Sequence, residues 1–127
     1  MGSGITTLGT GTFKDCTSLT SIILGENIET IESQVFIGCT NLAQVVVGDK
    51  VRTIGGNTFY NCSALQSLTL PSSVQSIGGY AFYGCSALRE LTMNGKTISQ
   101  VKAMANYASW RLPNGCVIHC TDGDIRI

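Results

Sequence analysis

The sequence predicts a mostly β, right-handed solenoid of about four 23-residue coils, capped at the C-terminus by a short helix and a β-hairpin. Phenylalanine recurs every 23 residues, and cysteine and leucine keep the same step. Each unit also contains two short stretches with the apolar spacing of β-strands. A lone unit buries too few apolar side chains to offset its ordering entropy, so the coils have to stack. The repeated columns are Phe13, Phe36, Phe59 and Phe82; Cys16, Cys39, Cys62 and Cys85; and Leu19, Leu42, Leu65 and Leu88.

Each coil should contain two strands and one tight turn. The L-x-x-I-x-L spacing, as in Leu19 to Leu24, predicts a first strand with one buried face. The V-x-x-I spacing, as in Val51 to Ile54, predicts a second, shorter strand. Apolar residues three apart in F-x-x-C-x-x-L suit a single 3₁₀ turn that closes the coil. Equivalent strands of successive coils should therefore pair in parallel, ~4.8 Å apart.

The repeat register makes two specific packing predictions. Phe59 should be a buried rung between Phe36 and Phe82. Glu29 and Arg52 occupy equivalent positions one coil apart on the second strand, so we expect them to form an exposed ion pair.

These residues resemble the BspA-like (treponemal-type) leucine-rich repeat family, whose unit has the pattern F-x-x-C-x-x-L-x-x-I-x-I-P-x-x-V-x-x-I-G. The match covers about residues 5–95 in roughly four units, and the unit containing Pro71 matches most fully. Gly25 and Gly48 stand where the family often has Pro, and Glu32 stands where it often has Gly. The resemblance implies a leucine-rich-repeat solenoid.

The 23-residue pattern stops after residue 95, which divides the chain into two regions. We expect a solenoid over residues 1–95 and a C-terminal cap over residues 96–127, packed on the solenoid as one unit. Thr97 and Gln100 have the spacing of a capping box, and an amphipathic stripe follows them. They predict a short helix that ends near Tyr107.

A hairpin should end the chain. Trp110 lies in the connection that leads to it. The Asp122-Gly123 pair between residues 117–120 and 125–127 is typical of a type I′ turn. We expect the helix and hairpin to shield the apolar end of the last coil from water and from end-to-end polymerisation.

The six cysteines invite a disulfide or metal interpretation, and their spacing argues against both. Equivalent side chains in stacked coils lie ~4.8 Å apart and parallel, whereas a disulfide needs converging Cβ atoms at about 3.8 Å. We expect the four repeat cysteines to be buried, unreactive free thiols. On a strand, Cys116 and Cys120 share one face and His119 lies on the other, so we expect no metal site and no catalytic Cys–His pair, and a surface role for His119.

Composition excludes several classes of function. Hydrophobic residues make up 43% of the 127 residues and charged residues 13%, which excludes a disordered or acidic-tail protein. The net charge is zero, so we expect no nucleic-acid partner and no attraction to an anionic membrane surface. No stretch approaches ~18 consecutive apolar residues, so we expect no membrane insertion. Residues 1–4 are too short and polar for a signal peptide and suggest a cloning remnant or the start of a fragment.

We interpret the chain as a non-catalytic binding or adhesion module without cofactor or metal. Its solvent-facing strand positions are mixed and mostly neutral, which suits a protein or glycan partner. The family resemblance implies adhesion of bacterial surface proteins to host or neighbouring-cell proteins, and hence a cell-surface or extracellular location. The predicted binding face comprises Ser21, Ile23, Gln44, Val46, Ser67, Thr69, Glu90 and Thr92.

Two other hypotheses stay open. The chain could be a structural spacer or assembly component of a larger bacterial surface protein or a phage particle, since its tail is similar to terminal modules of repeat proteins from gut bacteria and their phages. That hypothesis predicts a partner on the hairpin rather than on the repeat face. An enzyme is the third hypothesis, and one His with no carboxylate pair fixed by the repeat leaves few acid–base candidates.

Overall fold

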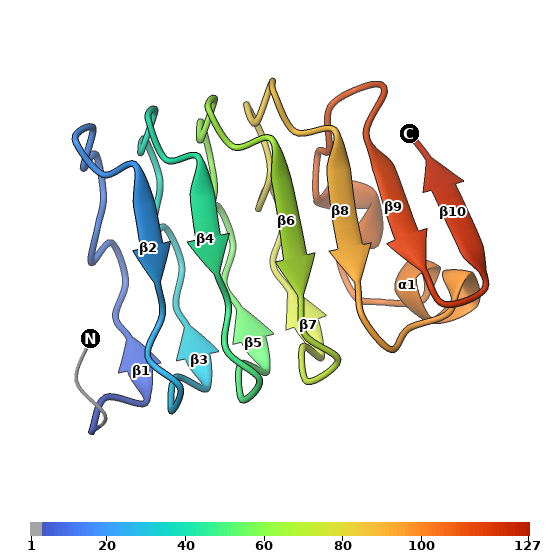
Figure 1. Cartoon of the computed structure of the whole chain (residues 1–127), viewed down its shortest axis with the longest axis horizontal. Helices are drawn as coiled ribbons and strands as arrows, with labels where there is room; N and C mark the ends of the chain where they lie inside the picture. Colours follow the sequence, from blue (N-terminus) through green and yellow to red (C-terminus); the bar gives the residue numbers. More distant parts are fainter. Residues whose placement is uncertain (1–3) are drawn as a thin grey trace.

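The chain is a β-solenoid, seen in a computed structural model that describes residues 4–127. Two rows of strands run along its length (Figure 1). The front row consists of β2 (Ser21–Ile23), β4 (Gln44–Val46), β6 (Ser67–Leu70), β8 (Glu90–Met93), β9 (Val117–Cys120) and β10 (Gly123–Arg126). The second row consists of β1 (Thr7–Leu8), β3 (Thr30–Ile31), β5 (Thr53–Ile54) and β7 (Ser76–Ile77). The helix α1 (Ile98–Lys102) and the 3₁₀ helix η1 (Tyr107–Ser109) lie between β8 and β9 in the chain.

The second row is one continuous parallel sheet in the order β1-β3-β5-β7. Each strand is paired with its equivalent 23 residues away, as in Ile31 with Ile54, and these isoleucines are buried. Glu29 and Arg52 meet across the ladder at 2.9 Å, and their side chains are 43% and 60% exposed. The predicted second strand and its exposed ion pair are therefore confirmed.

A column of phenylalanine rings runs through the core. Phe59 is fully buried, and its ring lies 5.5 Å from Phe36 and 5.8 Å from Phe82, within the range of favourable ring pairs. Trp110 closes the column edge-on to Phe82 at 6.4 Å, and its indole N–H donates to the Ile77 carbonyl at 3.3 Å. The predicted rung is confirmed. Trp110 lies in the connection before β9, as predicted, and its burial against the ring column is an additional role.

The first coil is less buried than its successors. Its column residues are half-buried, and this includes Cys16, which the repeat pattern predicts to be a buried thiol. Within residues 4–127 the first coil has a neighbouring coil on one side only, and later coils have neighbours on both. The half-buried column residues are Phe13, Cys16, Leu19 and Ile22.

The front row is not continuous, in contrast to the unbroken parallel ladder that the repeat predicts. It divides into a β2-β4 pair and a β6-β8-β9-β10 sheet. The Ala43 N–H donates to the Thr20 carbonyl of the preceding coil at 2.8 Å, and the Arg89 N–H donates to the Gln66 carbonyl at 2.9 Å. The Gln66 N–H occupies the same repeat position and has no such bond in the described part of the chain. The inward residues change at this step from Val45 and Val47, in and just after β4, to Leu68 and Leu70 in β6. Water can satisfy the freed backbone groups because this row faces solvent.

The helix begins as predicted and ends early. The Thr97 N–H donates to the Gln100 side chain at 2.9 Å, and the Gln100 N–H donates to the Thr97 hydroxyl at 3.2 Å. This confirms the capping box. The helix ends at Lys102 rather than near Tyr107, and the chain then reaches Asn106 in the left-handed conformation (φ 66°), which no α-helix can contain.

The hairpin is present with a different turn. Its two-residue loop is Thr121-Asp122, and Gly123 already belongs to β10, so the predicted Asp122-Gly123 turn is wrong. Neither loop residue has the positive φ that a type I′ turn requires. The Asp122 carboxylate instead accepts the Ile98 N–H at 2.8 Å, which ties the turn to the start of α1.

The tail extends the solenoid by a fifth, irregular turn. β9 pairs in parallel with β8, and Ile118 lies opposite Leu91. Ile118, Ile125 and Val101 belong to the same buried cluster as the repeat residues. The apolar end of the fourth coil is therefore covered by strand pairing as well as by side chains.

Candidate binding site

The predicted binding-face residues lie in two columns on the front row. Strand register pairs Ser21 with Gln44 and Ile23 with Val46. Farther along, it pairs Ser67 with Glu90 and Thr69 with Thr92. Seven of the eight residues are exposed, and Thr92 is half-buried. The structure thus brings all eight to one face, divided by the break between β4 and β6.

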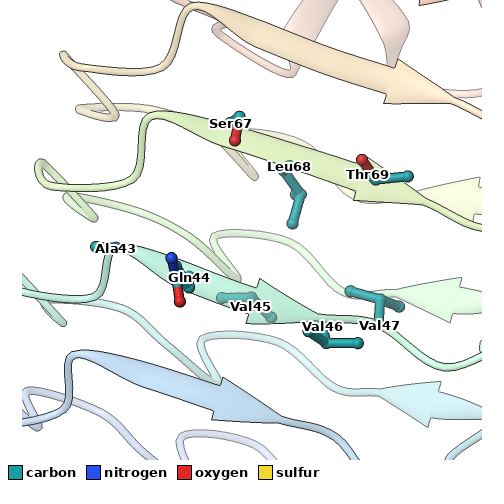
Figure 2. Close-up of a pocket in the computed structure, with 8 residues that line it drawn as sticks. All are labelled: Ala43, Gln44, Val45, Val46, Val47, Ser67, Leu68 and Thr69. Carbon is teal, nitrogen blue, oxygen red and sulfur yellow. The ribbon is translucent and has the colours of Figure 1, made fainter.

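A hollow of about 360 Å³ lies at this break and is here called the strand hollow (Figure 2). Leu68 extends from β6 toward β4, while Ser67 and Thr69 lie on the outer side of β6. The residues that line it are Ala43, Gln44, Val45, Val46, Val47, Ser67, Leu68 and Thr69. Four of the predicted face residues therefore surround a concavity that the repeat pattern does not predict.

Beside the strand hollow lies the most apolar part of the face. Ile23 is 73% exposed and Val46 is 54% exposed, and the two are register partners. Adjacent β-branched side chains in water form an apolar contact area with little conformational freedom to lose on binding. This pair forms the exposed apolar surface that borders the hollow.

The tail adds residues that sequence reasoning did not place on the face. Val117 lies opposite Glu90 and His119 opposite Thr92, so β9 continues both columns. The signal was present in the alternation of Cys116 and Ile118, which marks one face of β9 as buried. The column spacing changes from 23 to 27 residues at this step, which hides the equivalence from a fixed-period search.

His119 lies between two carboxylates. Its Nδ1 is 2.9 Å from Asp124 Oδ1, and its Nε2 is 3.1 Å from Glu90 Oε1. Arg126 also approaches Asp124, at 4.0 Å. Hydrogen bonds to Asp124 and then to Glu90 raise the pKa of His119 above its ordinary value. The imidazolium therefore joins β8, β9 and β10.

This arrangement predicts a pH-dependent stability. Because its pKa is raised in the folded state, His119 stabilises the fold below its ordinary pKa of 6.5, and the contribution is lost as pH rises through the folded-state pKa. The melting-temperature advantage of the natural protein over His119→Gln should be larger at pH 5.5 than at pH 8.5. Thermal melts of both proteins at the two pH values check this, and an equal advantage at both contradicts it.

The inner cysteines are buried thiols. Cys39 donates to the Phe13 carbonyl at 3.0 Å, and Cys62 and Cys85 make the same contact one and two coils later. Burial raises the pKa of Cys62 and raises that of Cys85 to about 12. These thiols stay protonated at neutral pH and are poor nucleophiles.

We expect the Cys39 and Cys62 thiols to resist alkylation until the chain unfolds. Both are fully buried, whereas Cys16 and Cys120 are half-buried and serve as internal controls. Timed iodoacetamide labelling followed by peptide mass analysis should show Cys16 and Cys120 modified first. Labelling of Cys39 at the rate of Cys16, or a Cys39–Cys62 disulfide, would refute the assignment.

Two other features are absent from residues 4–127. Among these residues, no three or more His, Cys, Asp or Glu side chains are grouped to hold a metal ion. No helix in the same range is long and apolar enough to cross a membrane.

Three solved structures are similar to this one. The leucine-rich repeat protein of T. pallidum has a TM-score of 0.53 and 26% identity, over 69% of this chain and 52% of that one. The pneumococcal vaccine antigen PcpA has a TM-score of 0.74 and 18% identity, over 92% of this chain and 34% of that one. A leucine-rich repeat protein from Bacteroides ovatus has a TM-score of 0.52 and 20% identity, over 94% of this chain and 40% of that one. The latter two likenesses concern the fold alone.

These proteins are longer than the present chain, which spans between about a third and about a half of their lengths. No curated protein matches the sequence. The family model for the BspA type leucine-rich repeat region matches residues 1–112 in six copies, past the regular coils and into the tail. Proteins of this kind are generally non-enzymatic modules for protein binding or adhesion. The chain belongs to the BspA-type leucine-rich repeat family.

Proposed function

We propose that this chain is a non-catalytic recognition module that binds a protein partner across the front row of strands. The observation that carries the proposal is the strand hollow beside the exposed Ile23–Val46 pair. A partner side chain that enters the hollow is able to bond the Ser67 and Thr69 hydroxyls, while adjoining partner atoms cover the two aliphatic residues. Hydroxyls and amides around them supply the polar rim.

A protein partner suits this face better than a glycan. None of the eight predicted face residues is aromatic. The face instead combines aliphatic anchors with Ser, Thr and Gln, the mixture of apolar centre and neutral polar rim typical of protein interfaces. Sugars are held mainly by aromatic rings and dense hydrogen bonding, which this face lacks.

The chemistry of the described side chains gives no support to catalysis by this chain. Both nitrogens of His119 are occupied by carboxylates, and the pKa values of Cys39 and Cys116 are raised by burial. A free base beside an activated nucleophile is what acid–base or covalent catalysis requires. We place the module at a cell surface or outside the cell, in keeping with its family and with a vaccine antigen of the same fold.

The test uses Val46→Asp, which puts a charge beside the strand hollow, and Thr53→Asp as a matched control on the second row. Both positions are exposed strand residues, so both variants should fold. Peptides selected by display on the full chain should include binders whose affinity, measured by biolayer interferometry, falls at least about tenfold in Val46→Asp only. Equal losses in the two variants, or selected peptides that all tolerate Val46→Asp, would count against the proposal.

One observation favours the alternative of a spacer or assembly component. Within residues 4–127, β10 pairs with β9 only, so its outer edge is open to a further strand. That alternative predicts binding that is lost in Arg126→Pro, which removes an N–H from the outer edge of β10, and kept in Val46→Asp. Such a result would transfer the binding role from the front-row face to the hairpin edge.

A further inference from the structure

A second hollow lies away from the front row, on the tight turns that connect β5 to β6 and β7 to β8. Its volume is about 470 Å³, and it is here called the tyrosine hollow. Tyr60 and Tyr83 stack with ring centroids 4.9 Å apart, and Tyr80 meets Tyr83 edge-on at 6.1 Å. The Arg111 guanidinium lies 5.3 Å from the centre of the Tyr80 ring. Asn57 completes the lining.

The aromatic rings are concentrated in the last two regular coils. Tyr83 is 45% exposed and Tyr80 is 44% exposed, so nearly half of each side chain faces water. The same repeat positions hold no aromatic residue in the first two coils, where Lys14 and Ile37 correspond to Tyr60 and Tyr83. The solenoid therefore does not need aromatic rings at these positions.

Tyr80 stands at a backbone position that disfavours it. Its φ is 56°, in the left-handed region, where a bulky side chain is an outlier. The equivalent positions of the other coils hold Gly11, Gln34 and Asn57, all with positive φ. Gly and Asn tolerate this conformation, and tyrosine does so at a cost to stability. A strained, half-exposed ring indicates a role in binding rather than in folding.

Polar groups around the rings are free for a ligand. Among residues 4–127, the hydroxyls of the three tyrosines, the Asn57 amide and the Arg111 guanidinium have no hydrogen-bond partner. No carboxylate lines the hollow, so Arg111 is its only charge. The hollow combines exposed ring surface, several neutral hydrogen-bonding groups and one cation.

We propose that the tyrosine hollow is a binding site for a saccharide that carries a carboxylate. The C–H faces of a sugar ring pack on aromatic surface, and its hydroxyls need the neutral donors and acceptors that the tyrosines and Asn57 supply. A guanidinium forms paired hydrogen bonds with a carboxylate. The same cation disfavours a quaternary ammonium ligand, which would need an uncharged or acidic aromatic cage.

The site is independent of the proposed protein-binding face. It is built from turn residues, and none of them belongs to the front row. Failure of one proposal therefore leaves the other standing.

The test is a titration of the full chain with 3′-sialyllactose and with lactose, followed by NMR chemical shifts. Tyr80→Asn copies the residue that the preceding coil carries at this position, so it should fold with an unchanged or higher melting temperature. Gln34→Ala changes the same repeat position two coils away and is the matched control. We expect saturable binding of sialyllactose, at least about tenfold weaker in Tyr80→Asn and unchanged in Gln34→Ala.

Arg111→Gln tests the role of the guanidinium charge separately from that of the tyrosine rings. In this variant, sialyllactose and lactose should bind equally, whereas the natural chain should prefer sialyllactose. The proposal is overturned if neither sugar binds, if Tyr80→Asn binds sialyllactose as well as the natural chain does, or if the natural chain does not distinguish the two sugars. Selective binding of a proline-rich peptide in place of the sugars would also overturn it, since such peptides dock on aromatic grooves as well.

Discussion

Phe59→Ala should lower the free energy of unfolding by about 3–5 kcal/mol, the usual cost of removing a fully buried phenylalanine. The ring lies between those of Phe36 and Phe82, so its loss leaves a void that the flanking coils can fill only by losing their own stacking. Urea unfolding followed by circular dichroism measures the change directly.

Ser67→Ala is the matched control, because Ser67 lies in the neighbouring strand of the same coil and is exposed. Its free energy of unfolding should stay within about 0.5 kcal/mol of the natural value. Glu90, another exposed position of the same column, is unsuitable because it pairs with His119. Similar losses in Phe59→Ala and Ser67→Ala would contradict the in–out register of the coils.

Deletion of residues 97–127 should make the chain insoluble or polymeric. The deletion uncovers Leu88, Leu91 and Met93, which are buried in the whole chain, and it frees the edge of β8 that pairs with β9. The apolar residues of the first coil are already half-buried, so the truncated chain has two open ends that can stack on one another. Size-exclusion chromatography with a thermal melt measures both solubility and stability.

Intact protein purified in parallel is the control for this deletion. If the tail were a separate element attached to a self-sufficient solenoid, the truncated chain would stay monomeric with an unchanged melting temperature. That outcome would mean that the pairing of β8 with β9 contributes little to the fold.

The regular coils could be predicted because their signals are local and repeated. Phe, Cys and Leu at fixed spacing specify a register that stacking then enforces, so one coil predicts the next. The capping box of Thr97 and Gln100 could also be predicted, because it depends on two residues that are three apart in the sequence. The two columns of face residues follow from the same period.

What escaped prediction depends on contacts between different kinds of segment. Trp110 completes the phenylalanine column from outside the 23-residue period, and His119 meets Glu90 across an irregular turn. The Thr121-Asp122 turn was decided by the bond from Ile98 rather than by the preference of Asp-Gly. The break between β4 and β6 arises where the spacing of the apolar positions is unchanged and only the residues that fill them differ, so no periodic signal marks it.

The proposed recognition face depends on that break, and amide hydrogen exchange at Gln66 tests it most directly. Ala43, Gln66 and Arg89 occupy the same repeat position, and the amides of Ala43 and Arg89 are bonded to the preceding coil at 2.8 and 2.9 Å. Residue-resolved exchange by NMR should find these two amides protected and the Gln66 amide exchanging at a rate close to that of an open chain. Protection of Gln66 equal to that of Ala43 and Arg89 would mean that the ladder is unbroken and the strand hollow is absent.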